Sequence, residues 1–429
     1  MDSKLLTSIV LPFVIGATLL MLLFDSDVST GLMYFLIIIS VLYLFKSKKS
    51  IFYEFDNSEL ILIFGFIFFT TTSVLWLLLF DTSHIALARN EIYAVFGLSI
   101  PILLYLRSIS FDVSFFLPQM MFFVAILVFS AALYQFLSWN IFDVKPIVFF
   151  DNMYSVFPGR ASGGINPIRF SAITLAMSAI SVLGVVHFTP RKYRVYFSIS
   201  AILLFISSIL ALSRGPMIAV PFLISFIIFS NFRLNKKSAI GFVLIISILG
   251  GLALSSDLFK SRIVSVKSNI ELMLSGEFRT SIGARVEMAY AAVLLIKRSP
   301  VIGSGIGSYK AGVLQLRSEG HKFGPEVGMW KNPHNELLNV LVEKGLFGFF
   351  TLIGLFAPLI YFYFKNRYYG TSESKFLSQS AMVIVIVYLI SGQSIALFEH
   401  KPFTFFYILM TLLIFSAMFS HRTRLTRKF

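Results

Sequence analysis

The sequence predicts an all-α, polytopic integral membrane protein with about 12 transmembrane helices and one large loop subdomain outside the membrane. Of its 429 residues, 57% are apolar and only 13% are charged, about half the charge of an average soluble domain. The mean hydropathy is +0.84. The apolar residues gather in runs near the length of about 20 residues that a helix needs to cross a bilayer. A soluble globular protein is therefore excluded.

Twelve apolar runs follow one another along the chain. The first lacks a basic segment and a small-residue cleavage site, so we expect it to be retained as a membrane anchor. The runs are 5–24, 30–45, 60–80, 92–106, 115–138, 168–187, 195–212, 217–231, 239–255, 334–364, 377–395 and 402–420.

Basic residues are distributed unevenly between the segments that join these runs. If the N-terminus is cytoplasmic, 18 Lys and Arg residues lie in the inner segments and six in the short outer segments. Because cytoplasmic loops are the ones enriched in Lys and Arg, this distribution predicts that both termini face the cytoplasm.

The stretch 256–333 is different in composition, with 11 basic and six acidic residues in 78 positions. We expect it to form an extracytoplasmic loop subdomain between residues 1–255, which hold nine spans, and residues 334–429, which hold three. A structured loop of this length usually has a function beyond joining two helices. Within it, residues 284–298 have the pattern of a helix with one apolar face.

Composition also narrows the chemistry. The formal charge of +15 suits anionic lipid, phosphate or nucleic acid. Cysteine is absent, which excludes disulfides, a thiolate nucleophile and sulfur-ligated metal sites. The middles of the predicted spans are nearly free of ionisable residues. This disfavours an ion-driven transporter and favours a site at the outer membrane surface.

Three arginines, Arg160, Arg169 and Arg214, interrupt the scarcity of basic residues in the short outer segments. A guanidinium binds phosphate through two parallel hydrogen bonds and stays charged, so this group suggests a phosphate or pyrophosphate ligand. The alternative, for any one of them, is a contact with lipid headgroups. Glycine-rich surroundings (GRASGGINP, LSRGP and, for Arg285, IGARVE) favour close approach of the backbone to a ligand.

His334 lies in the stretch NPHNELLNVLVEKGLFG. We expect Asn332 to cap a helix, Pro333 to take its first position and His334 to lie in its first turn. A helix N-terminus disfavours a charged imidazolium, so His334 is predicted to be neutral and suited to act as a general base. The alternative is a histidine that bonds only headgroups or loop backbone. By contrast, His187, His321 and His400 have no comparable surroundings.

Two weaker patterns have simpler interpretations. Gly303, Gly305 and Gly307 resemble a phosphate-binding loop, but their spacing is not GxGxxG and no βαβ unit surrounds them, so we expect a flexible turn. Asp25 and Asp27 form a DxD that could bind a metal or supply a catalytic carboxylate. Such acids more often terminate a span, and no metal site is predicted.

Together, the twelve spans, the large outer loop, GRASGGINP, LSRGP, RVEM, SPVIGSGIGSY, and His334-Asn335 followed by Gly345 and Gly348 resemble the O-antigen ligase family. That family also contains O-antigen polymerases and protein O-oligosaccharyltransferases. Two departures from its pattern are Pro216 after the SRG and Pro333 in place of a second histidine.

The resemblance implies transfer of a sugar chain from undecaprenyl pyrophosphate to an acceptor hydroxyl, with inversion and without cofactor or metal. Arg160, Arg214 and Arg285 would bind the pyrophosphate and His334 would be the base, with Asn335 and Arg169 in support. The expected protein is a ligase of the bacterial inner membrane that joins O-antigen to lipid A-core on the periplasmic face and binds no nucleic acid. A polymerase with the same donor and, from another class, a lipid-linked oligosaccharide flippase remain as alternatives.

Overall fold

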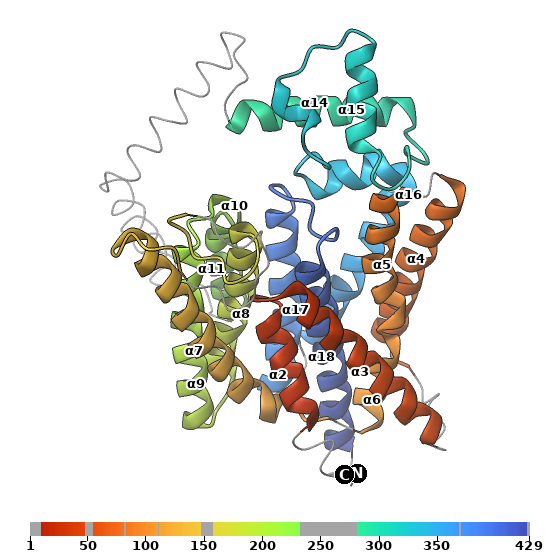
Figure 1. Cartoon of the computed structure of the whole chain (residues 1–429). Coiled ribbons are helices and arrows are strands. Elements are labelled where there is room, and N and C mark those ends of the chain that lie inside the picture. The colour runs from red at the N-terminus through yellow and green to blue at the C-terminus, as the bar shows by residue number, and fades with distance from the viewer. Residues whose placement is uncertain are drawn as a thin grey trace. The chain divides into compact units, whose positions relative to one another are not determined.

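The computed structural model describes residues 10–47, 55–80, 83–109, 111–146, 158–231, 281–368 and 370–426. Within these ranges every regular element is a helix and there is no strand (Figure 1), so the predicted all-α class is confirmed. The helices are α2 (Leu11–Met21), α3 (Ser26–Lys46), α4 (Asn57–Leu79), α5 (His84–Leu98), α6 (Ile100–Ser108), α7 (Val113–Asn140), α8 (Pro167–His187), α9 (Arg191–Leu210), α10 (Arg214–Met217), α11 (Ala219–Asn231), α14 (Ser281–Arg298), α15 (Tyr309–Ser318), the 3-10 helix η2 (Pro325–Gly328), α16 (Glu336–Asn366), α17 (Ser372–Ser391) and α18 (Lys401–Thr426).

In the described part of the chain, 10 helical stretches are long and apolar enough to cross a membrane, which confirms a multi-pass membrane protein. They match ten of the twelve predicted runs. The predicted run 239–255 lies outside the described residues. The first predicted run, 5–24, is described from residue 10 onward, and its helix α2 has 11 residues.

The chain divides into two compact units. Unit 1 comprises residues 1–223 and 350–429, and unit 2 comprises residues 224–349. The predicted division at residues 255 and 333 stays a prediction, because residues 232–280 lie outside the described part of the chain.

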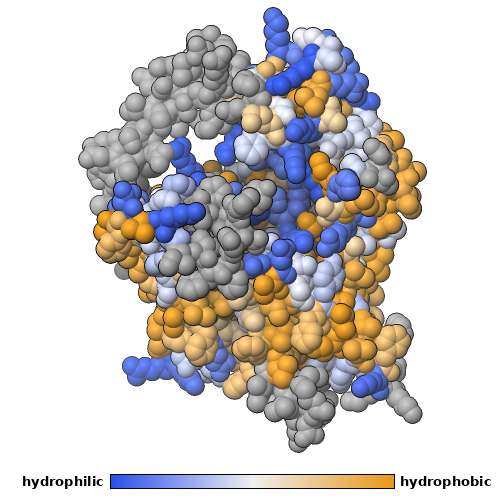
Figure 2. All heavy atoms as spheres, in the orientation of Figure 1, coloured by the Kyte–Doolittle hydropathy of each residue, from blue (hydrophilic) through white to orange (hydrophobic). Residues whose placement is uncertain are grey.

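Unit 1 is built around α18. The apolar stretch of α18 is 94% buried and that of α8 is 83% buried, whereas those of α3 and α9 are each 33% buried. Many apolar side chains of unit 1 are therefore exposed, and on the face seen in Figure 2 such residues appear in orange. A helix with an apolar outer face is suited to lipid rather than to water.

Glycine allows α4 and α16 to pack closely within unit 1. A Cβ atom added to Gly65 would lie 2.1 Å from the carbonyl oxygen of Gly354. The two backbones thus touch where neither helix has a side chain, which is a common way for helices to associate in membranes.

In unit 2, α14, α15, η2 and the first turns of α16 enclose a small apolar core. The core contains Met288, Leu295, Val313 and Val342, and α14 confirms the helix predicted at 284–298. Tyr309 is fully buried there and its hydroxyl donates to the carbonyl of Met288 at 3.1 Å. Burial raises the pKa of Tyr309, so its hydroxyl stays protonated as a donor.

The helix predicted at 334–364 begins later than expected and is broken. It starts at Glu336, and Gly345 has φ 58° and ψ −147°, outside the helical region. The first part of α16 ends at this break, and Val342 from that part packs in the unit 2 core. The predicted run 334–364 thus corresponds to a candidate span that starts at Glu336 and is broken at Gly345.

Candidate active site

Unit 1 contains three of the predicted site arginines, Arg160, Arg169 and Arg214. Arg160 supports the turn that directly precedes Arg214. Arg160 donates from Nε to the carbonyl of Ala211 at 3.0 Å, and from Nη2 to the carbonyl of Leu212 at 3.0 Å and to Ser213 Oγ at 2.9 Å. These three residues directly precede Arg214. The structure thus brings GRASGGINP and LSRGP together, although they are about 50 residues apart.

Arg214 begins α10 and the apolar stretch that continues to Asn231. Its side chain is exposed. Leu212, two residues earlier, has φ 48°, a left-handed conformation that is unfavourable for a branched side chain. Strained turns of this kind persist only where surrounding contacts hold them, and the hydrogen bonds from Arg160 are such contacts.

The glycines beside these arginines approach the protein's own chain. A Cβ atom on Gly164 would lie 1.5 Å from the carbonyl oxygen of Phe24, and one on Gly163 would lie 2.2 Å from that of Leu23. Gln135 fixes the same loop, because its side chain accepts from the Gly163 amide at 3.0 Å and donates to the Gly163 carbonyl at 2.6 Å. The interpretation that these glycines admit a ligand is therefore corrected: they let the loop pack on the end of α2.

Arg169, predicted as a supporting residue, lies in the first turn of α8 and its Nη2 lies 2.8 Å from Nε2 of His400. Beside it, Arg89 pairs with Glu399 at 2.8 Å in a fully buried contact. Sequence reasoning assigned no role to Glu399 or His400. The available signal was a pair of adjacent ionisable residues at the outer end of a predicted span.

Unit 2 contains the other predicted residues, His334, Asn335 and Arg285. His334 is partly buried and has φ 52°, another left-handed conformation. Its imidazole contacts the indole of Trp330, with ring centroids 4.8 Å apart and planes at 68°. Arg285 is exposed on α14.

The predicted cap of the His334 helix was wrong by three residues. Asn332 Oδ1 accepts from the His334 amide at 3.0 Å, and Asn335 Oδ1 accepts from the Leu338 amide at 3.0 Å. Asn335 is thus the capping residue, and His334 precedes the helix rather than lying in its first turn. Because Asn332 forms a tight turn with His334, the latter takes a left-handed conformation that cannot continue into a helix. A neutral His334 therefore no longer follows from a place inside the first helical turn.

The glycine-rich stretch around Gly303 is not a phosphate-binding loop. The amides of Ser304 and Gly305 donate to the carbonyls of Val342 and Glu343 at 2.8 and 2.9 Å, and the Leu346 amide donates to the carbonyl of Pro300 at 2.9 Å. The loop therefore satisfies the backbone groups that the break in α16 leaves without helical partners. A Cβ atom on Gly345 would lie 2.5 Å from Val301, so this crossing requires glycine.

The DxD of the first outer segment has a structural role at its first member. Asp25 Oδ1 accepts from the amides of Asp27 and Val28 at 2.7 and 3.0 Å and so caps α3. This supports the simpler interpretation of the motif, in which the acid marks the end of a span.

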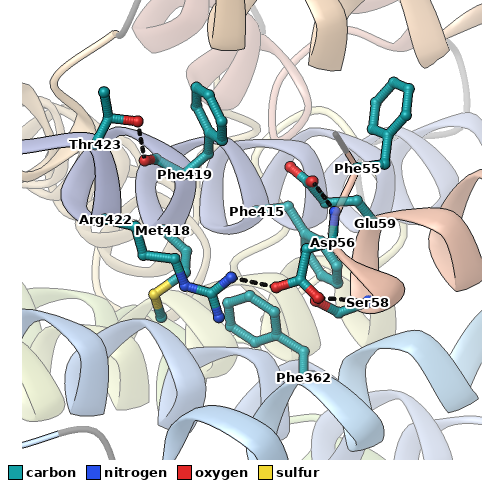
Figure 3. Close-up of a pocket in the computed structure, with 10 residues that line it drawn as sticks. All are labelled: Phe55, Asp56, Ser58, Glu59, Phe362, Phe415, Met418, Phe419, Arg422 and Thr423. Carbon is teal, nitrogen blue, oxygen red and sulfur yellow. Dashed lines mark hydrogen bonds and ion pairs between the residues drawn. The ribbon is translucent and has the colours of Figure 1, made fainter. Parts of the chain in front are cut away.

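A cavity of about 310 Å³ lies elsewhere in unit 1, where the C-terminal end of α18 meets the start of α4 (Figure 3). Phenylalanine rings line it, and Asp56 accepts from both Lys365 and Arg422. Although burial favours the neutral acid, these hydrogen bonds hold the pKa of Asp56 well below its ordinary value. Because its cations are already bound by a carboxylate, this cavity is poorly suited to an anion.

The fold and these residues define a multi-pass helical membrane protein with arginines grouped at one end of unit 1. Residues 199–353 match the family described as O-Antigen ligase, so the chain contains an O-antigen ligase family domain. The predicted resemblance is confirmed. This family includes O-antigen ligases and related glycosyltransferases. The matched region contains Arg214, Arg285 and His334, whereas Arg160 and Arg169 precede it.

The chain is also similar to an uncharacterized protein of Haemophilus influenzae. The two are 27% identical over 259 residues, which cover 58% of this chain and 63% of that protein. The alignment thus spans less than two thirds of the relative's length.

Proposed function

We propose that this protein is an O-antigen ligase of the bacterial inner membrane. It transfers O-antigen polysaccharide from undecaprenyl pyrophosphate to a sugar hydroxyl of lipid A-core, with inversion and without a metal. In this proposal both termini face the cytoplasm and the reaction takes place at the periplasmic face.

The observation that carries this proposal is the construction of the turn before Arg214. Arg160 directs three hydrogen bonds to it, and all three acceptors are neutral oxygens. A guanidinium keeps its positive charge in such bonds, and Arg214 adds a second guanidinium directly after the turn that Arg160 contacts. Two guanidinium groups suit a pyrophosphate, which carries several negative oxygens.

The reaction needs little beyond binding of charge and removal of one proton. The acceptor oxygen forms a bond to the anomeric carbon as the bond from that carbon to the pyrophosphate oxygen breaks. The arginines stabilise the negative charge that develops on the leaving undecaprenyl pyrophosphate. His334, in its neutral form, takes the proton of the acceptor hydroxyl.

Two alternatives use the same kind of lipid-linked substrate. A polymerase would take the same donor but a second lipid-linked repeat as acceptor, and the family domain is compatible with both enzymes. A flippase would need a polar path through the bundle. The apolar stretch of α18 at the centre of unit 1 contains no Asp, Glu, Lys or Arg between residues 402 and 421, which favours a site at the surface.

The test has two parts. The first analyses the lipopolysaccharide of a strain that lacks this protein, and the second assays glycan transfer by the purified protein. We expect the deletion to leave full-length O-antigen that is not joined to lipid A-core, and the purified protein to join the two. Lipopolysaccharide with a single repeat would indicate the polymerase. Absence of periplasmic lipid-linked glycan would indicate the flippase.

A further inference from the structure

Two buried contacts between charged or titratable side chains fix the connection between α17 and α18, and the proposed reaction uses neither. Arg89 Nη1 lies 2.8 Å from Glu399 Oε1, with the two side chains 6% and 4% exposed. Arg169 Nη2 lies 2.8 Å from His400 Nε2. Removing charged groups from water is costly, so their retention here calls for a function.

These contacts close a cluster of three segments, which we call the arginine cluster. Its segments are 158–169, 210–215 and 391–400, and each is joined to both others. Arg160 joins the first segment to the second through its bonds to residues 211–213. Gly215 joins the second to the third, because a Cβ atom added to it would lie 2.7 Å from Ser394 Oγ. Arg169 joins the first to the third through His400.

The third segment of the arginine cluster is short and has hydrogen bonds of its own near both ends. Two backbone hydrogen bonds lie within it: the Ser394 amide donates to the carbonyl of Ser391 at 2.9 Å, and the His400 amide donates to the carbonyl of Leu397 at 3.2 Å. The ring of Phe398 between them is fully buried and lies 5.7 Å from that of Tyr388. Ser394 beside Gly215 and the buried contacts of Glu399 and His400 thus lie within one segment of ten residues, 391–400.

The protonation of His400 follows from its partner. A guanidinium can only donate hydrogen bonds, so Nε2 of His400 must accept from Arg169 and the imidazole is neutral. The four side chains then comprise two cations and one anion, which leaves one positive charge in excess. Because Nε2 is occupied by the arginine, His400 is not suited to remove a proton from a substrate.

We propose that Arg89, Glu399, Arg169 and His400 are positioning residues that hold Arg214 in the orientation that binds the phosphate groups of the lipid-linked donor. This inference rests on the proposed function. Without Glu399, Arg89 loses its carboxylate partner, the third segment shifts, and Ser394 no longer supports the turn at Gly215. Arg214 keeps its charge but loses its fixed direction.

The main experiment measures the affinity of the full chain for undecaprenyl pyrophosphate in nanodiscs of phosphatidylcholine. We expect Glu399→Gln to weaken this affinity about tenfold, roughly the effect of losing one charge-assisted hydrogen bond to the ligand. The transfer rate at saturating donor should fall as well, because Arg214 also stabilises the charge that develops on the leaving pyrophosphate.

A matched control is available at the other end of unit 1. Arg107 and Glu59 form an ion pair of the same length, 2.8 Å, with both side chains 6% exposed. We expect Glu59→Gln to lower the melting temperature as Glu399→Gln does and to leave donor affinity unchanged. Equal loss of affinity in the two variants would assign both pairs to general stability and overturn the inference.

A double-mutant cycle links the pairs to Arg214 itself. If Glu399 acts through Arg214, adding Glu399→Gln to Arg214→Ala should weaken donor affinity by less than about twofold further. Full additivity would overturn the inference while leaving the proposed function intact. A wild-type protein without affinity for undecaprenyl pyrophosphate, or an Arg214→Ala variant with normal affinity, would instead overturn the proposed donor site and the inference with it.

A second pair of variants covers the case in which Glu399→Gln does not fold. The side chain of His400→Gln can still accept from Arg169, whereas that of His400→Leu cannot. We expect donor affinity near that of the wild type for the first and a severalfold loss for the second. Equal affinities in the two variants would contradict the positioning role.

Discussion

The two ends of α18 both gather charged side chains, but they bind their cations differently. At the C-terminal end, Lys365 and Arg422 both donate to the carboxylate of Asp56. Near the N-terminal end, Arg160 donates to neutral oxygens and Arg169 contacts a neutral imidazole. At 1.5 Å per residue, about 30 Å of helix separates the two ends.

This difference indicates which end is suited to an anionic substrate. A carboxylate offsets part of the charge of the cations that it binds and occupies their N–H groups, whereas a carbonyl or a neutral imidazole leaves the charge in place. The C-terminal end is therefore suited to joining helices. The other end also contains carboxylates, since Glu399 pairs with Arg89 and Lys401 lies 3.8 and 3.9 Å from Asp27 and Glu91. The partners of Arg160 and Arg169 described above, however, are neutral groups.

The largest expected effect separates turnover from binding. His334→Ala should lower transfer by about 10²–10⁴-fold, the usual contribution of a general base, while donor affinity changes little. Single-turnover transfer and donor binding are measured on the same nanodisc preparation. Transfer near the wild-type rate would remove His334 from the reaction and return it to a structural role beside Trp330.

A smaller effect tests the geometry of the substrate end. Arg214→Lys keeps the charge but loses the planar fork, so transfer should fall about tenfold, as expected for one lost charge-assisted hydrogen bond. The matched change at the other end is Arg422→Lys, for which transfer should stay within about twofold. If both variants transfer alike, charge alone is sufficient at either end.

The C-terminal end of α18 should show a stability effect without a functional one. Asp56→Asn removes the acid that binds Lys365 and Arg422 and should destabilise the protein by about 1–3 kcal/mol. Transfer per folded molecule should be unchanged. A melting curve in detergent, combined with a transfer assay below the melting temperature, distinguishes the two. Loss of transfer in fully folded Asp56→Asn protein would contradict a purely structural cluster.

The same residue predicts a pH dependence. The pKa of Asp56 is lowered in the folded state, so its contribution to stability is fully present above its unfolded pKa of about 4 and is lost as the pH falls toward the folded pKa. Between about pH 5 and pH 2, the wild type should therefore lose more stability than Asp56→Asn. Parallel loss in the two proteins would show that Asp56 is not the responsible group.

The smallest expected effect is that of chelation. Asp25 caps α3 with its carboxylate, and the proposed leaving group needs only arginine, so EDTA should leave transfer within about 20% of its original rate. Abolished transfer that magnesium or manganese restores would identify metal as an essential participant and would make Asp25 and Asp27 the leading catalytic candidates.

The sequence alone was sufficient to predict the fold class and the positions of most membrane spans, because a helix that crosses the lipid needs an apolar stretch of a nearly fixed length. It was not sufficient for the start of α16. Both Asn332 and Asn335 are suitable caps, and only the tertiary fold decides that Asn332 forms a turn with His334 while Asn335 caps the helix.

The contacts of the arginine cluster were also beyond sequence reasoning. Arg169 and His400 are 231 residues apart, and no local pattern indicates that they meet. The positive-inside rule marked Arg160, Arg169 and Arg214 as unusual, but it could not separate an arginine that supports a turn from one that the turn presents. That separation required the hydrogen bonds of Arg160.

The central claim is that the cations at the two ends of α18 serve different purposes. The direct measurement compares Arg214→Ala with Arg422→Ala in the same nanodiscs, recording the affinity for undecaprenyl pyrophosphate and the melting temperature of each. We expect Arg214→Ala to lose donor affinity by tenfold or more with a nearly unchanged melting temperature, and Arg422→Ala to melt earlier with unchanged affinity. Equal losses of affinity, or a loss confined to Arg422→Ala, would contradict the claim.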